Sequence, residues 1–195
     1  MRQLVHLAFS IIVICLLAPH LANASSTMTD KQLLSVERSI IDSDEVRKKI
    51  EKSAVLLARY EIEAKKLVKL NEIDADAAVI SSKAEQLMDL SKTVIDSARF
   101  RLPQCDAYLA LSLTLEGQLA DITHARLESD YHHDGALPQA PAECYHAKDL
   151  FVHPATVIVL TRDDPELGDE TKKAIRAEIS EVLAHTELVR QLVLY

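Results

Sequence analysis

The chain has 195 residues, a net formal charge of −8 and only three glycines. Binding to nucleic acid needs clustered lysine and arginine, so an acidic chain of this kind is a poor candidate for a nucleic-acid partner. All-β folds need many tight turns, for which glycine is the preferred residue, so the scarcity of glycine favours long helices with few connections.

The N-terminal segment, residues 1–24, has the pattern of a cleaved secretory signal. Arg2 precedes an apolar run over residues 8–18, and the small residues at 22–24 match the positions that a signal peptidase reads. An uncleaved membrane anchor is the alternative, but the run has about 11 residues whereas a membrane-spanning helix needs roughly 20. We therefore expect residues 25–195 to form one mature domain, secreted or periplasmic, with no stable membrane span.

Residues 29–42 are predicted to form a short leading helix. Its apolar side chains exceed what a four-helix core can readily bury. Such a helix is a candidate for docking onto another envelope or secreted protein, or onto a second copy of this chain. The favoured interpretation is that the helix caps the bundle. The candidate partner-binding residues are Leu33, Leu34, Val36, Ile40 and Ile41.

Two heptad patterns predict an antiparallel helical hairpin after this helix. A new helix is expected to start at residues 42–44, and residues 71–74 are expected to form a turn, with Asp74 as the cap of the second helix. In each helix, apolar or small residues recur in alternating steps of four and three, which is typical of helices packed along one seam. The first seam comprises Val46, Ile50, Ser53, Leu57, Tyr60, Ala64 and Leu67, and the second comprises Ile73, Ala77, Ile80, Ala84, Leu87, Ser91, Val94 and Ala98.

A third helix is expected to begin near Pro103, because proline is well placed in a first helical turn, and to end near Glu128. Leucines alternate with small residues over residues 108–115, so a strand is the alternative there. A long loop over residues 130–143 follows.

A fourth helical segment is expected from Cys144 to about Leu160. Pro154 lies within it and either kinks the helix or starts a new one, and β-branched residues make a strand over 155–161 the alternative. A last helix has the seam Ile175, Ile179, Val182, Thr186, Val189 and Val193. The predicted fold is therefore all-α: a four- to five-helix bundle with a long N-terminal antiparallel hairpin, one disulfide and one long crossover loop.

The disulfide is predicted from Cys105 and Cys144, the two cysteines of the expected mature chain. An even pair in an oxidising compartment favours a bridge over free thiols or metal ligation. The third helix would be about 35 Å long, and the extended loop can span about 45 Å. The loop can therefore return along that helix to Cys144, which would make the third and fourth helices roughly parallel.

A histidine-rich region offers the candidate metal ligands His132, His133 and His146. Imidazole and carboxylate groups suit zinc or copper. His124 and His153 flank the same region. No pair has firm ligand spacing, so an exposed polar loop is the favoured interpretation. His185, one helical turn from Glu181, is interpreted as a surface residue that pairs with that carboxylate.

The sequence contains no nucleophile elbow, phosphate-binding loop, paired-histidine zinc helix or haem-attachment motif. We therefore expect no cofactor and a non-enzymatic interaction protein, such as an adaptor, a chaperone-like factor or a toxin-neutralising partner. The alternative function is a metal-binding helical bundle that uses the loop at His132 and His133.

Overall fold

The computed structural model describes the backbone of residues 30–194 and the side chains of most of these residues. The expected signal segment lies outside the described residues. The candidate partner-binding side chains also lie outside those described, and they are Leu33, Leu34, Val36, Ile40 and Ile41. The chain divides into a unit that ends at Ser39 and a unit that begins at Ile40. Residues 30–39 are helical, and the observations that follow concern the second unit.

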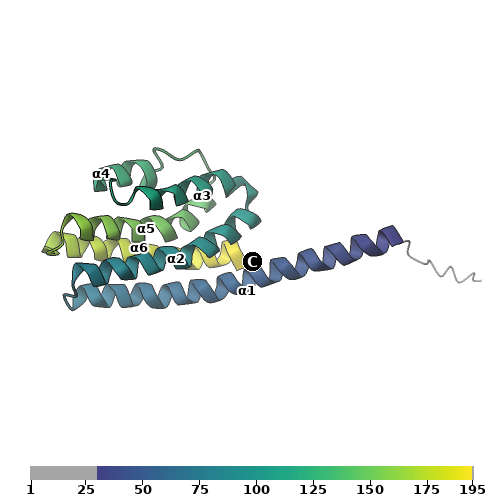
Figure 1. Cartoon of the computed structure of the whole chain (residues 1–195), viewed down its shortest axis with the longest axis horizontal. Coiled ribbons are helices and arrows are strands. Elements are labelled where there is room, and N and C mark those ends of the chain that lie inside the picture. Colours follow the sequence, from purple (N-terminus) through teal and green to yellow (C-terminus); the bar gives the residue numbers. More distant parts are fainter. Residues whose placement is uncertain (1–29, 195) are drawn as a thin grey trace, which may run out of the picture. The chain divides into compact units, whose positions relative to one another are not determined.

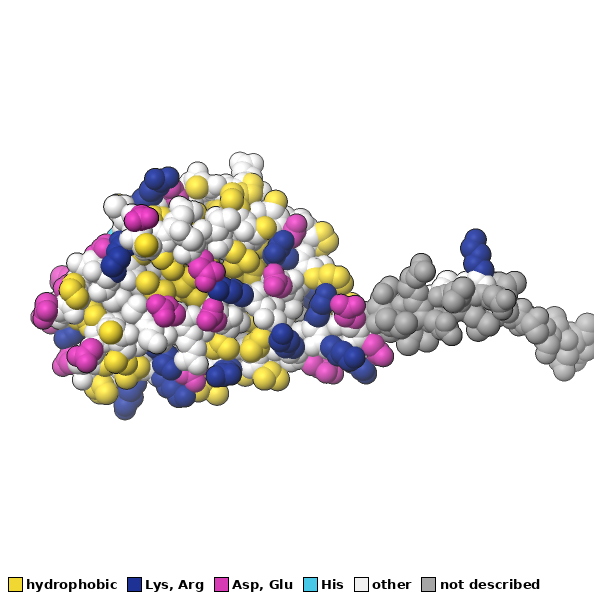
Figure 2. Space-filling model, in the orientation of Figure 1, with side chains coloured by type: hydrophobic (Ala, Val, Ile, Leu, Met, Phe, Trp, Pro, Cys, Tyr) yellow, Lys and Arg dark blue, Asp and Glu magenta, His cyan; other side chains and the backbone are white. Residues whose placement is uncertain are grey.

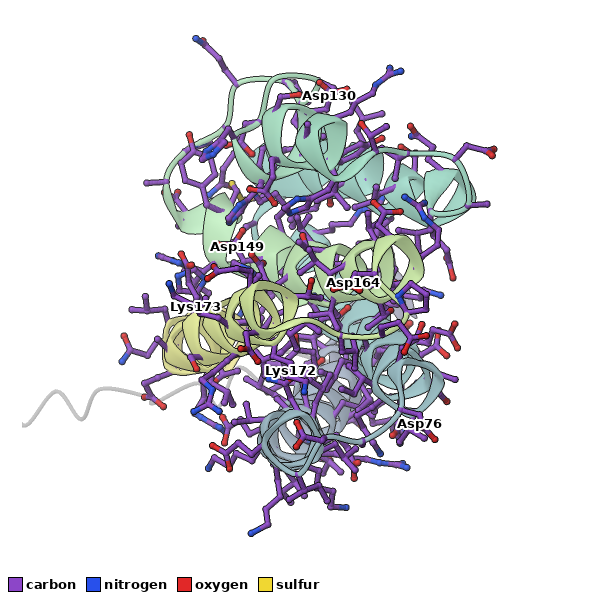
Figure 3. The ribbon with its side chains drawn as sticks, turned by 90° about the vertical axis from the view of Figure 1, so that its left-hand side faces the viewer. Asp76, Asp130, Asp149, Asp164, Lys172 and Lys173 are labelled. Atoms are coloured by element: carbon purple, nitrogen blue, oxygen red, sulfur yellow. A yellow bond between two sulfur atoms is a disulfide. The ribbon has the colours of Figure 1, made fainter. Side chains whose placement is uncertain are left out.

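All regular secondary structure in the described part of the chain is helical, with no strand, as expected for an all-α fold (Figure 1). The four long helices are α1 (Asp30–Glu72), α2 (Ala77–Arg101), α5 (Glu143–Asp163) and α6 (Asp169–Leu194). The short elements between α2 and α5 are η1 (Pro103–Cys105), α3 (Asp106–Ser112), η2 (Leu113–Gln118), α4 (His124–Leu127) and η3 (Glu128–His132). Helix α5 contacts both α2 and α6, and the short elements cover its other side (Figure 3).

The predicted hairpin is confirmed, since α1 and α2 run antiparallel (Figure 1). The first seam is buried from Ser53 onward, and the second is buried from Ile80 onward. Small residues line the contact, and Ser53 Oγ donates a buried hydrogen bond to Ser97 Oγ at 2.7 Å. Ile73 is the exception, with 63% of its surface exposed, because it lies in the turn rather than in the seam.

Two predicted boundaries of the hairpin are wrong. No new helix starts at residues 42–44, because α1 passes through them without interruption. Ser43 and Asp44 are exposed there, and capping residues whose side chains face solvent are tolerated inside a helix. The N-cap of α2 is Asp76 rather than Asp74, whose φ of 58° lies in the left-handed region that aspartate tolerates.

An ion pair links α1 to α2 near the turn. Glu63 is 9% exposed at its side chain and accepts hydrogen bonds from Lys83 at 2.7 Å and from Lys66 at 2.9 Å. The bond from Lys83, followed by that from Lys66, lowers the pKa of the Glu63 carboxyl from 4.5 to about 2. The folded state therefore holds Glu63 in its ionised form.

We expect Glu63→Gln to lower the free energy of unfolding at pH 7 by about 1–2 kcal/mol, because it removes the charge that both lysines bond. The folded pKa lies below the unfolded value, so this stabilisation is complete above pH 4.5 and is lost as the pH falls toward 2. Urea unfolding of the wild type and of Glu63→Gln across this pH range should show that the difference between their free energies of unfolding decreases as the pH falls. A difference that is constant with pH would contradict the assignment.

The predicted third helix is not continuous. A short α-helix gives way to the tighter 3-10 geometry of η2, and then to α4 and the π-helical turn η3. Leu109 and Leu115 are buried, whereas Leu111 between them is 41% exposed, so the leucines do not all face the core. Thr123 is the N-cap of α4, and its hydroxyl accepts a hydrogen bond from Arg126 N at 3.2 Å. The strand alternative over residues 108–115 is excluded.

The disulfide between Cys105 and Cys144 is confirmed, with a Cα–Cα distance of 5.4 Å. It joins the start of α3 to the first turn of α5, and both helices run in the same direction (Figure 1). The connection after η3 therefore acts as the expected crossover.

Helix α5 continues through Pro154, so this residue does not start a new helix, and residues 155–161 form no strand. Proline has no N–H, which leaves the carbonyl of Leu150, four residues earlier, without its helical donor. Tyr60 of α1 supplies the missing donor, with its hydroxyl 2.9 Å from Leu150 O. Burial, and then the charge of Asp149, raise the pKa of Tyr60, so its proton stays in place for this bond.

The face shown in Figure 2 carries basic and acidic side chains interspersed with apolar ones. None of the helices within the described residues has the length and apolar character that crossing a membrane requires.

Candidate functional site

Five histidines lie in a row at the junction of η3, α5 and α6, and we call them the histidine cluster. Their ring centroids are separated by 5.2, 4.8, 5.8 and 4.9 Å in succession. In that order they are His133, His132, His153, His185 and His146.

Helices α5 and α6 carry their histidines and neighbouring carboxylates at matching intervals along the sequence. Positions three and seven residues after the first fall on one face of an α-helix. Helix α5 presents one such set and α6 presents another, and the two faces meet because α5 packs against α6. The α5 set is His146, Asp149 and His153, and the α6 set is Glu178, Glu181 and His185.

His153 is the most deeply buried member of the cluster, with no exposed surface. Its Nδ1 donates a hydrogen bond to Glu178 Oε2 at 2.7 Å. Its Nε2 is buried and has no hydrogen-bond partner among the described residues. A carboxylate that accepts from one ring nitrogen fixes the tautomer, so the lone pair of Nε2 is available to a metal ion.

His132 is held in a similar way from the π-helical turn. Its Nδ1 donates to Glu128 Oε2 at 2.8 Å, which leaves Nε2 as the nitrogen free to bind. Burial lowers the pKa of His132, but the hydrogen bond and charge of Glu128 outweigh burial, so the net shift is upward. π-helical turns often occur at functional sites, because they re-aim side chains that a regular helix would point elsewhere.

His132, His153 and Glu181 form a set whose potential ligand atoms all lie within 4.8 Å of one another. Two imidazoles and one carboxylate are ligands that zinc, copper and non-haem iron accept. Both histidines have a carboxylate on the opposite ring nitrogen, an arrangement that orients metal ligands and raises their basicity. We call this set the central triad.

A buried lysine fixes the backbone next to the central triad. Lys148, 2% exposed at its side chain, donates to Tyr131 O and His132 O, both at 2.9 Å, and to Asp134 Oδ1 at 2.8 Å. Tyr108 donates to the same Asp134 oxygen at 2.6 Å. Burial, followed by this bond, raises the pKa of the Tyr108 hydroxyl. The position of His132 therefore depends on Lys148.

The sequence-predicted ligands are only partly brought together. His132 and His133 are neighbours, and both lie near Glu128. That set competes with the central triad for His132, and its carboxylate already accepts a bond from His132. His146 lies instead beside Asp149 and His185.

The expected pairing of His185 with Glu181 on the surface is wrong. His185 Nδ1 lies 2.9 Å from Asp149 Oδ2, and only 19% of the His185 side chain is exposed. Figure 3 shows Asp149 on α5, between α6 and the layer that carries Asp130. The packing of α6 against α5 turns His185 inward.

From the sequence, His153 was only a flanking histidine, and neither Glu178 nor the ligand role of Glu181 was predicted. The signal was the repeated interval of three and then four residues among histidines and carboxylates, once in α5 and once in α6. It was overlooked because charged residues at such intervals are usually exposed.

Comparison with known proteins finds no matching protein family, no similar curated protein and no similar solved structure. The functional conclusion therefore rests on the residues of the histidine cluster.

Proposed function

We propose that this protein binds a divalent transition-metal ion of the zinc or copper class at His132, His153 and Glu181. The observation that carries the proposal is the fully buried imidazole of His153, whose Nε2 has no partner among the described residues. A buried polar atom left unpaired costs about 1–3 kcal/mol. A metal ion on Nε2 would replace this cost with a bond.

The surroundings of the central triad support a cation. Glu181 is exposed and completes the triad from α6, while Glu128 and Glu178 each accept a hydrogen bond from one of its histidines. A metal ion bound at about 2.0–2.2 Å to these nitrogen and oxygen atoms would tie η3, α5 and α6 to one centre. Bound metal should therefore raise the melting temperature.

The test is calorimetric titration of the oxidised chain, residues 25–195, with Zn²⁺ and with Cu²⁺. We expect tight binding that weakens at least about 100-fold in Glu181→Ala and in His153→Ala, and about 10- to 100-fold in Glu178→Gln. Glu181 is exposed, so its replacement tests the site without disturbing the core.

The matched control is Glu170→Ala, which removes an exposed carboxylate of α6, the helix of Glu181, that belongs to none of the ligand sets. Wild-type affinity in the control is expected. Unchanged affinity in both Glu181→Ala and His153→Ala would refute the proposal.

An interaction with another envelope or secreted protein stays a prediction from the sequence. Secretion is supported by the disulfide, because such bridges persist in oxidising compartments. The metal site and a protein partner are compatible, since the candidate partner-binding residues belong to a different segment.

A further inference from the structure

A second ligand set lies beside the central triad and shares no residue with it. The potential ligand atoms of His146, Asp149 and His185 all lie within 4.8 Å of one another. We infer that these three residues form a second site for a divalent metal ion of the same class, adjacent to the first. Because it has its own ligands, this site is independent of the proposed function.

The imidazole of His146 carries the inference. Its Nδ1 is buried and has no hydrogen-bond partner among the described residues, although part of the ring reaches the surface. The ring packs edge-on against His185 at 4.9 Å. The unpartnered Nδ1 of His146 therefore lies beside a second imidazole that can bind the same ion.

Asp149 supplies the negative charge of this set. Its side chain is 9% exposed, so the carboxylate is largely shielded from solvent. The His185 Nδ1 atom lies 2.9 Å from Asp149 Oδ2 but outside hydrogen-bond geometry. A metal ion would engage the buried carboxylate and both imidazoles together.

The second site should bind more weakly than the first. Lys148 Nζ lies 3.3 Å from Asp149 Oδ1 and opposes a further cation there. The two sites are also neighbours, because the rings of His153 and His185 are 5.8 Å apart, so an ion in the first site repels one in the second. We therefore expect ordered filling, with the central triad occupied first.

The experiment is native mass spectrometry and calorimetry of the oxidised chain with Zn²⁺ alone. The wild type is expected to bind two ions in two resolved steps. His146→Ala should lose the weaker step and keep the tighter one within about threefold, whereas Glu181→Ala should lose the tighter step and keep the other. Glu170→Ala should retain both steps. The partial exposure of His146 makes its replacement compatible with folding.

NMR spectra of the wild-type protein test the inference without relying on a variant that fails to fold. Long-range ¹H–¹⁵N spectra of the imidazoles should show the His146 and His185 nitrogens shifting only with the second equivalent of Zn²⁺. Retention of both steps in His146→Ala, a single step that His146→Ala leaves unchanged, or loss of the second step in Glu170→Ala would each overturn the inference. Failure of the first site alone would appear as a single binding step that His146→Ala abolishes and Glu181→Ala leaves unchanged.

Discussion

Replacing Cys105 and Cys144 together by serine should lower the free energy of unfolding by about 4 kcal/mol. The bridge spans a sequence separation of 39 residues, and without it the unfolded chain gains the conformational freedom of that whole segment. Urea denaturation of the oxidised wild type and the double variant measures the difference. The loss should be large because the bridge anchors the short helices, whose few turns cannot hold themselves in place.

Chemical reduction supplies the control for this prediction. A thiol reductant should destabilise the wild type by a similar amount and leave the double-serine variant unchanged. The oxidised wild type should also be two hydrogens lighter than the reduced form. Equal stability of the wild type and the double variant would contradict the expected contribution of the bridge.

Lys148→Met should cost about 3–5 kcal/mol, because removing one partner of a buried ionic network leaves the others without compensation. The Asp134 carboxylate and two carbonyl oxygens would lose a donor that is 98% buried at its side chain, given its 2% exposure. Urea unfolding measures the cost. The same variant should weaken Zn²⁺ binding, since Lys148 fixes the backbone of His132.

Lys66→Met is the matched control for the buried lysine. Lys66 is 58% exposed at its side chain and pairs with Glu63 from its own helix, so we expect a change of less than about 1 kcal/mol. A comparable loss of stability in both variants would mean that the burial of Lys148 has no special importance.

The bundle could be predicted from the sequence in the segments where apolar and small residues recur with the period of a helix. The seam residues from Ser53 to Leu67 and from Ile80 to Ala98 are buried as the heptad pattern indicates. The disulfide could be predicted because the expected mature chain has an even number of cysteines and because the extended loop is long enough to bring them together. In both cases a local rule is enough, because it does not depend on how distant helices face each other.

The short elements between α2 and α5 could not be predicted in the same way. There the leucines satisfy neither helical nor strand period, and packing against α5 decides which of them are buried. The histidine cluster depends even more on tertiary structure, since its ligands come from η3, α5 and α6. Glu181 and His153 are 28 positions apart in the sequence, and only the rotation of α6 against α5 makes them neighbours.

The disulfide between Cys105 and Cys144 keeps the molecule covalently connected even when the backbone between these residues is cut. A protease that cuts once between residues 133 and 142 would produce two polypeptides that still migrate as one species without reductant. The fragment that ends after His132 would stay tethered to the fragment that begins α5. This connection is therefore a suitable place for an inserted reporter or for new termini in a circular permutant, because the molecule remains in one piece when its backbone is opened there.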